Sequence, residues 1–205
     1  MELIVCEGEG EFVETVSEWC RTQIQQYHAQ SVFIPAGRTP ESLYQYWEES
    51  HPPYLKGLKL IQIDDVLTGD KRHIFKKFFK QFLPSYQQAI QWIEDGEVVG
   101  DIALLGLGLN GHIAFHEPGV SLTLFSGCVN LGTETCKNLG IREGEWGISY
   151  GLAACKKSKA ILIIVKGATK KEILKRLLSG DKTLPASHLM QHPNLTIIAD
   201  SDAVS

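Results

Sequence analysis

The sequence lacks long apolar runs, and it contains little cysteine. Its longest apolar stretches, 160–165 and 102–109, are far shorter than the roughly 18 to 20 residues that a membrane span needs, so we expect no transmembrane helix. The opening stretch MELIVCEGEGE carries acidic residues where an export signal carries basic ones, which favours a cytoplasmic protein. The cysteines are scattered without a CxxC pair, which disfavours a disulfide framework: Cys6, Cys20, Cys128, Cys136 and Cys155.

No block of like charge occurs either. Lysine and arginine number 20 and aspartate and glutamate 24, which gives a net charge of −4 and disfavours electrostatic binding of nucleic acid. With 43% hydrophobic and 21% charged residues, the composition is that of an ordinary globular protein. The length of 205 residues predicts a single domain over 1–205.

Short apolar segments alternate with segments of helical period along the chain. Helices are expected over 11–29, from Pro40 onward with Thr39 as N-cap, and over 170–178. This alternation predicts an α/β fold, with an open, mostly parallel, Rossmann-like sheet and helices on both faces. The expected strands are 3–5, 31–35, 58–63, 101–108, 160–167 and 195–200.

Four polar loops directly follow predicted strands. They are GRTP at 37–40, an acidic pair at 64–65, the loop after Leu109, and KGATK at 166–170. Open parallel sheets bind ligands beyond the carboxyl ends of their strands, so we expect these loops to form one site. The interval 119–150, rich in Gly, Ser, Thr and Asn, is expected to be a mobile cover.

Two of these loops carry cations at expected helix N-termini. GRTP places Gly37, Arg38 and Thr39 where free N–H groups and the helix dipole favour an anion, and Lys170 supplies a point charge. Both features are consistent with a phosphate site. A tight turn with an N-cap, and a solvated lysine, are the alternatives that need no ligand.

The other two loops carry groups suited to proton transfer. Strand alternation sends Asp64 and Asp65 to opposite sides, so one of them faces the cleft, where partial desolvation suits a base. His112 follows an Asn-Gly turn, and histidine is the usual general acid–base near neutral pH. A turn-capping aspartate and a solvated loop histidine are the alternatives here.

Two other interpretations of the segment 106–119, GLGLNGHIAFHEPG, are disfavoured. His112, His116 and Glu117 lack the HExxH order of a zinc-binding helix, so we expect no metal. The glycines have the GxGxxG spacing, but Pro118 soon ends any helix that a dinucleotide site requires.

This segment is accompanied, in chain order, by VFIPAGRTPESLY, IQIDDVLTG, VKGATKKEIL and LPASHLMQHPNLTIIAD. Over residues 30–203 the set resembles the glucosamine-6-phosphate deaminase family, which is related to 6-phosphogluconolactonase. The resemblance implies a fold of the ribose-phosphate isomerase/CoA-transferase-like superfamily. It also implies conversion of glucosamine 6-phosphate into fructose 6-phosphate and ammonia, with no metal or organic cofactor.

The resemblance assigns roles to residues at matching positions. Asp64 matches the base that takes the proton from carbon 2, His112 matches the group that opens the sugar ring, and Glu117 matches the glutamate that supports this histidine. Asn110 stands in this catalytic set where many members have aspartate. The residues expected to hold the substrate are Gly37, Arg38, Thr39, Asp65, Gly111 and Lys170.

Several positions depart from the family pattern. Asp65 replaces glutamate, Arg38 replaces glycine or serine, His116 replaces asparagine, and Arg142 is the candidate for the phosphate-binding arginine of the cover. The alternative functions are a 6-phosphogluconolactonase-type hydrolase and a non-catalytic sugar-phosphate-binding module. We expect a monomer or small homo-oligomer whose partner is a phosphorylated amino sugar, with no nucleic acid and no membrane.

Overall fold

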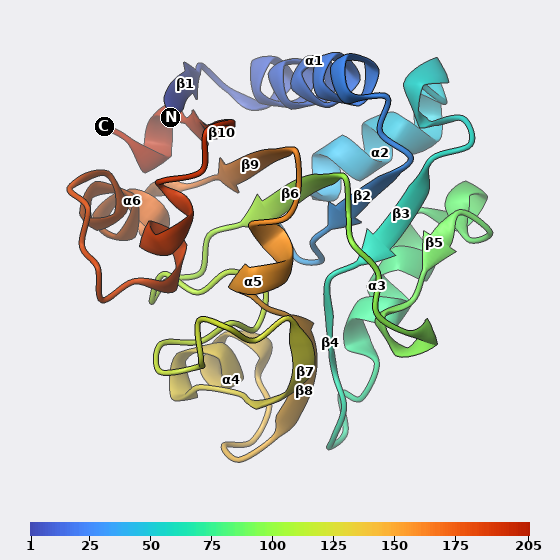
Figure 1. Ribbon diagram of the computed structural model, residues 1–205. Coiled ribbons are helices and arrows are strands. Elements are labelled where there is room, and N and C mark those ends of the chain that lie inside the picture. The colour runs from blue at the N-terminus through green and yellow to red at the C-terminus, as the bar shows by residue number, and fades with distance from the viewer.

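A large parallel sheet forms the centre of the molecule, as the computed structural model of residues 1–205 shows (Figure 1). Its seven strands have the order β1-β10-β9-β6-β2-β3-β5, and every neighbouring pair is parallel. This confirms the predicted open, mostly parallel sheet. The strands are β1 (Glu2–Cys6), β2 (Ser31–Ile34), β3 (Lys59–Gln62), β5 (Ile90–Gln91), β6 (Ile102–Gly106), β9 (Ala160–Val165) and β10 (Leu195–Asp200).

Helices cover both faces of this sheet, as predicted. On one face lie α1 (Glu9–Tyr27), α2 (Glu41–Ser50) and α3 (Ile74–Phe82), and on the other lie α5 (Leu152–Cys155) and α6 (Lys171–Leu178). Short 3₁₀ segments complete the connections: η1 (Pro53–Leu55), η2 (Pro84–Tyr86), η3 (Ile93–Asp95), η4 (Ala168–Lys170), η5 (Pro185–Leu189) and η6 (Ser201–Ala203).

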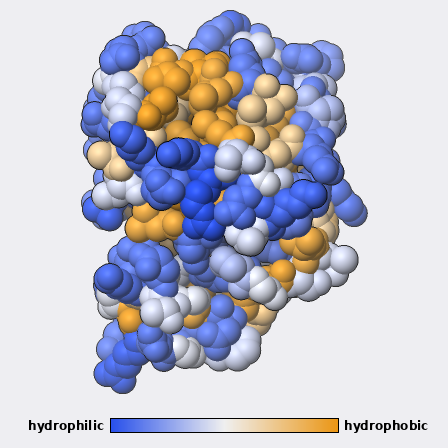
Figure 2. Space-filling model, turned by 90° about the vertical axis from the view of Figure 1, so that its left-hand side faces the viewer, coloured by the Kyte–Doolittle hydropathy of each residue, from blue (hydrophilic) through white to orange (hydrophobic).

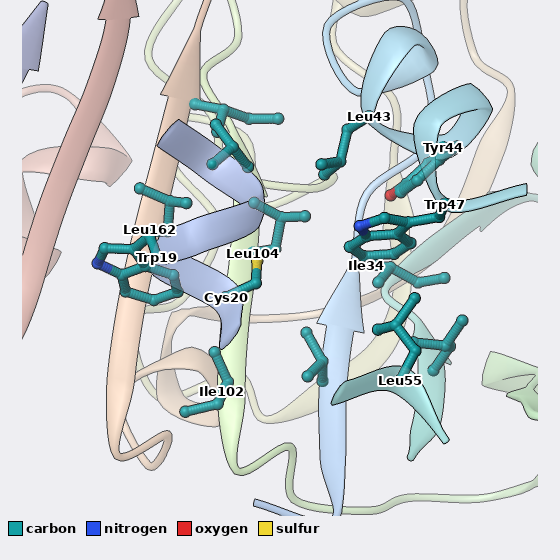
Figure 3. Packing of buried hydrophobic residues seen from close by; sticks show 14 of the residues in the cluster. Trp19, Cys20, Ile34, Leu43, Tyr44, Trp47, Leu55, Ile102, Leu104 and Leu162 are labelled. Atoms are coloured by element: carbon teal, nitrogen blue, oxygen red, sulfur yellow. The ribbon is translucent and has the colours of Figure 1, made fainter. Parts of the chain in front are cut away.

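The central strands are buried on both faces because their side chains alternate between two apolar clusters of 25 residues each. In β6, Leu104 belongs to the cluster under α1 and α2, and Leu105 to the cluster under α6. Figure 3 shows Cys20 of α1 close to Leu104, and Trp47 of α2 close to Ile34 of β2. Each such side chain stabilises the fold by about 1.5–3 kcal/mol, so this packing holds the strand ends in place.

The connections of the large sheet change direction between β2 and β6. From β2 the chain runs through α2 to β3 on one side, whereas from β6 it goes on to β9 and β10 on the other. Open α/β sheets bind ligands at the carboxyl ends of strands where the order reverses. The GRTP loop follows β2 and the loop with His112 follows β6, so both lie at this switch point.

The interval 119–150 contains β7 (Ser126–Asn130), α4 (Thr133–Leu139) and β8 (Trp146–Tyr150). β8 pairs in antiparallel fashion with β7 and with β4 (Asp64–Val66), forming a second, three-stranded sheet. The expected cover therefore contains regular structure, and it packs on neighbouring segments through a small apolar cluster of Val66, Phe115, Val129, Leu131 and Cys136.

A single residue, Ile63, joins the two sheets. It follows β3 and precedes β4, so the chain passes directly from the large sheet into the small one. Its N–H donates to the carbonyl of Ile34 at the end of β2, at 3.3 Å, and its carbonyl accepts from the N–H of Tyr150 at the end of β8, at 2.9 Å. Asp64, the next residue, is therefore fixed by hydrogen bonds on both sides of the junction.

The start of α2 differs from the prediction. The N-cap is Pro40 rather than Thr39, and no side chain caps the helix. The reason is local, because Pro40 already has helical angles, φ −86° and ψ −1°, and its carbonyl accepts from the N–H of Tyr44 at 3.0 Å. The turn through GRTP therefore supplies the first helical carbonyl without the Thr39 hydroxyl.

β1 forms one edge of the large sheet and presents apolar side chains to the surface. Leu3 is 36% exposed and Val5 is 40% exposed. Figure 2 views the side of the molecule on which both termini lie and shows apolar groups gathered over its upper part. None of the helices has both the length and the apolar character that crossing a membrane requires.

Candidate active site

Two adjacent carboxylates begin β4, and their surroundings differ sharply. Asp64 and Asp65 are both buried, at 5% and 1% exposure. No group of the protein donates a hydrogen bond to Asp64, whereas Asp65 accepts four. The donors to Asp65 are Val66 N–H at 2.8 Å, Gln62 Nε2 at 3.0 Å, Phe75 N–H at 3.0 Å and Lys76 N–H at 3.1 Å.

These surroundings suit the two side chains to different tasks. Burial raises the pKa of Asp64 well above its usual value, and the negative charge of Asp65 adds to this rise. A buried carboxylate without internal donors is suited to accept a proton from a ligand. Asp65, expected to bind substrate, instead binds two N–H groups of the first turn of α3, where the helix dipole favours a negative charge.

The loop after β6 and helix α4 bring a polar cluster together around His112. Asn110 Nδ2 donates to Glu117 Oε2 at 2.8 Å, and Asn110 Oδ1 accepts from the His112 N–H at 3.2 Å. His112 Nδ1 lies 3.6 Å from Glu117 Oε2 and 3.3 Å from Thr135 Oγ1. The Thr135 hydroxyl also donates to Glu117 Oε1. Three residues singled out in the sequence thus meet, together with a fourth from α4.

Glu117 is ionised within this cluster although it is only 5% exposed. Burial pushes its pKa up, but the nearby positive charge of His112 and the hydrogen bonds from Thr135 and Asn110 outweigh burial and lower the pKa to about 2. An amide at position 110 fits this arrangement because it donates to the carboxylate. A second carboxylate there would repel the first.

Two glycines leave room for the cluster. A Cβ on Gly108 would lie 2.3 Å from ring atoms of His112, and a Cβ on Gly132 would lie 3.0 Å from Glu117 Oε2. The imidazole therefore lies directly against the backbone of its own loop. This explains the glycine at position 108, because a larger residue would clash with the His112 ring.

Two cations, Arg38 after β2 and Lys170 after β9, lie near each other. Lys170 Nζ donates to the carbonyl of Leu107, just beyond β6, at 2.6 Å. Burial, together with the nearby positive charge of Arg38, lowers the pKa of Lys170 to about 8. Neither cation forms an ion pair with an acidic side chain. The GRTP loop, which carries Arg38, turns at Gly37, whose φ is +106°.

The remaining candidates have mainly local contacts. Gly111, with φ +81°, accepts at its carbonyl from the N–H of Ala186 in η5, at 2.9 Å. Arg142 is exposed after α4 and forms no hydrogen bond. His116 is 1% exposed, and its Nδ1 accepts from the N–H of Leu152 at the start of α5, at 3.2 Å. No three His, Cys, Asp or Glu side chains form a metal-binding group.

Two polar contacts of this region were not foreseen from the sequence. Thr135 comes from α4, in an interval for which no element is predicted, and Ser149 Oγ of β8 accepts from the N–H of Phe115 at 3.0 Å. Both contacts join segments far apart in the chain. The sequence gives only a general indication of such contacts. A buried glutamate needs hydrogen-bond donors, and the interval 119–150 was the segment that could supply them.

Sequence comparison relates the chain to sugar-phosphate enzymes. The family model described as glucosamine-6-phosphate isomerases/6-phosphogluconolactonase matches residues 77–198. A glucosamine-6-phosphate deaminase of Lactococcus lactis subsp. lactis (strain IL1403) is 39% identical over 153 residues, 65% of this chain and 64% of that protein. One from Lactobacillus acidophilus (strain ATCC 700396 / NCK56 / N2 / NCFM) is 34% identical over 200 residues, 83% of this chain and 82% of that protein. The chain thus spans somewhat less than two thirds of the Lactococcus relative.

Solved structures share the fold over nearly the whole chain. A monomeric glucosamine-6-phosphate deaminase matches with a TM-score of 0.82 at 21% identity, covering 99% of this chain and 98% of that one. The 6-phosphogluconolactonase of Thermotoga maritima matches with a TM-score of 0.70 at 18% identity, covering 97% and 99%. At these identities the likeness establishes the fold.

Proposed function

Because this chain belongs to the family of glucosamine-6-phosphate isomerases and 6-phosphogluconolactonases, we propose that it converts glucosamine 6-phosphate into fructose 6-phosphate and ammonia. The observation that carries the proposal is the contrast between its two adjacent carboxylates. Asp65 accepts four internal hydrogen bonds, whereas buried Asp64 accepts none. Asp64 is thereby free to exchange a proton with a substrate at this edge of the sheet.

The phosphate of the substrate binds between the two cations. Arg38 and Lys170 lack acidic partners, and the positive charge of one lowers the pKa of the other, so a phosphate between them relieves their repulsion. Gly37 and Thr39 add a turned backbone and a hydroxyl at the start of α2. Phosphate binding at this point orients the sugar toward the strand ends.

His112 opens the sugar ring. Its Nδ1 faces Glu117 and Thr135, which leaves Nε2 for the substrate. His112 takes the proton of the hydroxyl on carbon 1 and delivers a proton to the ring oxygen, while the bond between that oxygen and carbon 1 breaks and carbon 1 becomes an aldehyde. The ionised Glu117 stabilises the imidazolium that exists between the two transfers.

Asp64 then carries out the isomerisation. It takes the proton from carbon 2 while the aldehyde oxygen gains a proton and becomes the hydroxyl of carbon 1, which gives an enolamine between carbons 1 and 2. It then returns a proton to carbon 1 while the nitrogen loses one, which leaves an imine at carbon 2. Water adds to the imine and ammonia leaves, so that carbon 2 becomes the ketone of fructose 6-phosphate. The raised pKa of Asp64 suits this role, because the carboxyl group must both accept and release a proton.

The finer assignments follow from this reaction. The final hydrolysis of the imine makes the enzyme a hydrolase as well as an isomerase, and the substrate places it in amino-sugar catabolism, including that of N-acetylglucosamine. We assign it to the cytoplasm as a monomer or small homo-oligomer.

The test is the release of ammonia from glucosamine 6-phosphate by the purified protein, with fructose 6-phosphate measured in the same samples. We expect equal yields of both products. Asp64→Asn is expected to abolish exchange of solvent deuterium at carbon 2 and to leave substrate binding nearly unchanged. Asp70→Asn is the matched control, because Asp70 is exposed and forms no hydrogen bond or ion pair.

Two other outcomes refute the proposal and identify its alternatives. Hydrolysis of 6-phosphogluconolactone, without release of ammonia, would make the protein a lactonase. A thermal shift with glucosamine 6-phosphate, without turnover of either compound, would make it a sugar-phosphate-binding module. Deuterium exchange that persists in Asp64→Asn would remove the role of Asp64 alone.

A further inference from the structure

The contact between His112 and Glu117 is indirect in this structure. His112 Nδ1 is 3.6 Å from Glu117 Oε2, longer than a hydrogen bond, and the closer oxygen is that of Thr135 at 3.3 Å. The same hydroxyl bonds the other carboxylate oxygen, Glu117 Oε1. Thr135 is 3% exposed, so its hydroxyl is shielded from water between the two side chains.

The direction of these hydrogen bonds follows from the chemistry of the three groups. An ionised carboxylate only accepts, so the single hydroxyl proton of Thr135 points to Glu117. The hydroxyl oxygen then has only lone pairs to offer His112, and the contact forms only if Nδ1 carries a proton. Neutral imidazole has one N–H, so Nε2 of His112 is left with a lone pair.

We propose that Thr135 is a positioning residue that holds His112 in the tautomer with the proton on Nδ1, so that Nε2 accepts the proton of the substrate in ring opening. This inference rests on the proposed function. The chain of contacts runs from His112 Nδ1–H to the Thr135 hydroxyl and from that hydroxyl to Glu117. Thr135 touches no reacting atom and acts through His112.

Other contacts hold α4 in the position that this role requires. Gly132, directly before α4, donates its N–H to Glu117 Oε1 at 3.4 Å, and Lys71 Nζ donates to the carbonyl of Leu139 at the other end of the helix. Cys136, the neighbour of Thr135, packs in the small apolar cluster beside Phe115. Glu117 Oε2 is occupied by Asn110, so Oε1 is the oxygen that α4 reaches.

Two substitutions separate the hydroxyl from the shape of the side chain. Thr135→Val keeps the volume and removes the hydroxyl, and Thr135→Ser keeps the hydroxyl and removes the methyl group. With glucosamine 6-phosphate, we expect Thr135→Val to lower kcat by about 10- to 100-fold with little change in KM, the loss typical of one charge-assisted hydrogen bond. Thr135→Ser is expected to restore kcat to within about threefold of the wild type, because it restores that bond.

The tautomer itself gives a readout that does not depend on turnover. In protein labelled with ¹⁵N-histidine, at a pH where His112 is neutral, we expect the wild type and Thr135→Ser to show a protonated Nδ1 and an unprotonated Nε2. Thr135→Val is expected to show a mixture of both tautomers. Circular dichroism and thermal unfolding verify that each variant is folded.

The outcomes distinguish this inference from the proposed function. A wild-type protein that releases no ammonia refutes the proposed function. An active wild type whose Thr135→Val variant keeps its kcat, or whose Thr135→Ser variant is as impaired as Thr135→Val, refutes the positioning role. If Thr135→Val does not fold, the wild-type spectrum still decides, because a proton found on Nε2 of neutral His112 overturns the inference.

Discussion

Replacing Glu117 with glutamine tests the electrostatics of the cluster around His112. The pKa of Glu117 falls from its ordinary value of 4.5 to about 2 in the folded protein. Each tenfold change in proton affinity corresponds to about 1.4 kcal/mol, so the ionised form of this carboxyl group stabilises the fold by about 3 kcal/mol. Glutamine keeps the shape of the side chain but offers one acceptor oxygen to several donors. The free energy of unfolding of Glu117→Gln at pH 7 is therefore expected to be lower than that of the wild type by most of this amount.

The sign of the pH dependence follows from the direction of the pKa change. A carboxyl group whose pKa is lower in the folded state stabilises the fold above its unfolded pKa and loses this contribution as the pH falls through the folded pKa. The difference in the free energy of unfolding between wild type and Glu117→Gln should thus have its largest value above pH 5. It should be smaller by about 1 kcal/mol at pH 4 and by about 2 kcal/mol at pH 3.

Urea unfolding at pH 7, 5, 4 and 3 measures this gap directly. Comparing two proteins at each pH removes the contribution of all other carboxylates. Glu143→Gln is the matched control, because Glu143 is exposed and forms no hydrogen bond, so its gap should stay near zero throughout. A gap for Glu117→Gln that stays constant from pH 7 to pH 3 would refute the assignment of an ionised, hydrogen-bonded Glu117.

Two further substitutions test the rest of the site. Lys170→Met is expected to raise KM for glucosamine 6-phosphate by about 10- to 100-fold, as loss of a charged hydrogen bond costs roughly 1.5–3 kcal/mol. Since the pKa of Lys170 is about 8, wild-type kcat/KM should fall as the pH rises above 8, and this fall should be absent in the variant. Gly108→Ala places a Cβ 2.3 Å from the ring of His112, so kcat should fall by about 100-fold while KM changes little. Steady-state kinetics decides both: an unchanged KM in the first variant would assign the phosphate to other groups, and an unchanged kcat in the second would mean that the loop adjusts freely.

Six of the seven strands of the large sheet were predictable from local apolar runs, and only the two-residue strand β5 was not predicted. LTIIAD at 195–200 is mostly apolar and becomes β10 with the same limits, and 170–178 becomes α6 with one residue fewer. Buried parallel strands require such runs, and amphipathic helices require a 3.6-residue period. The gathering of polar loops at one edge then follows from topology.

The small sheet and its contacts were not predictable in this way. β4 has three residues and two of them are aspartates, so no apolar pattern marks it as a strand. The alternation of side chains along a strand places Asp64 and Asp65 on opposite sides. It does not reveal which of the two lacks internal hydrogen bonds, because two of the donors to Asp65 come from α3. α3 has no counterpart among the predicted elements. The Thr135 contact likewise depends on how α4 packs, and packing is a property of the folded chain.

The passage of the chain through Ile63 places two parts of the site on one folded unit. β4 and β3 are one nearly continuous strand, and Ile63 is bonded to β2 on one side and to β8 on the other. Asp64 is therefore the first residue of the small sheet and is adjacent to the point where that sheet is tied to the large one. α4 lies between β7 and β8, so Thr135 belongs to the same unit as Asp64. The proposed base for carbon 2 and the proposed support of the ring-opening histidine thus share one substructure, although they are far apart in the sequence.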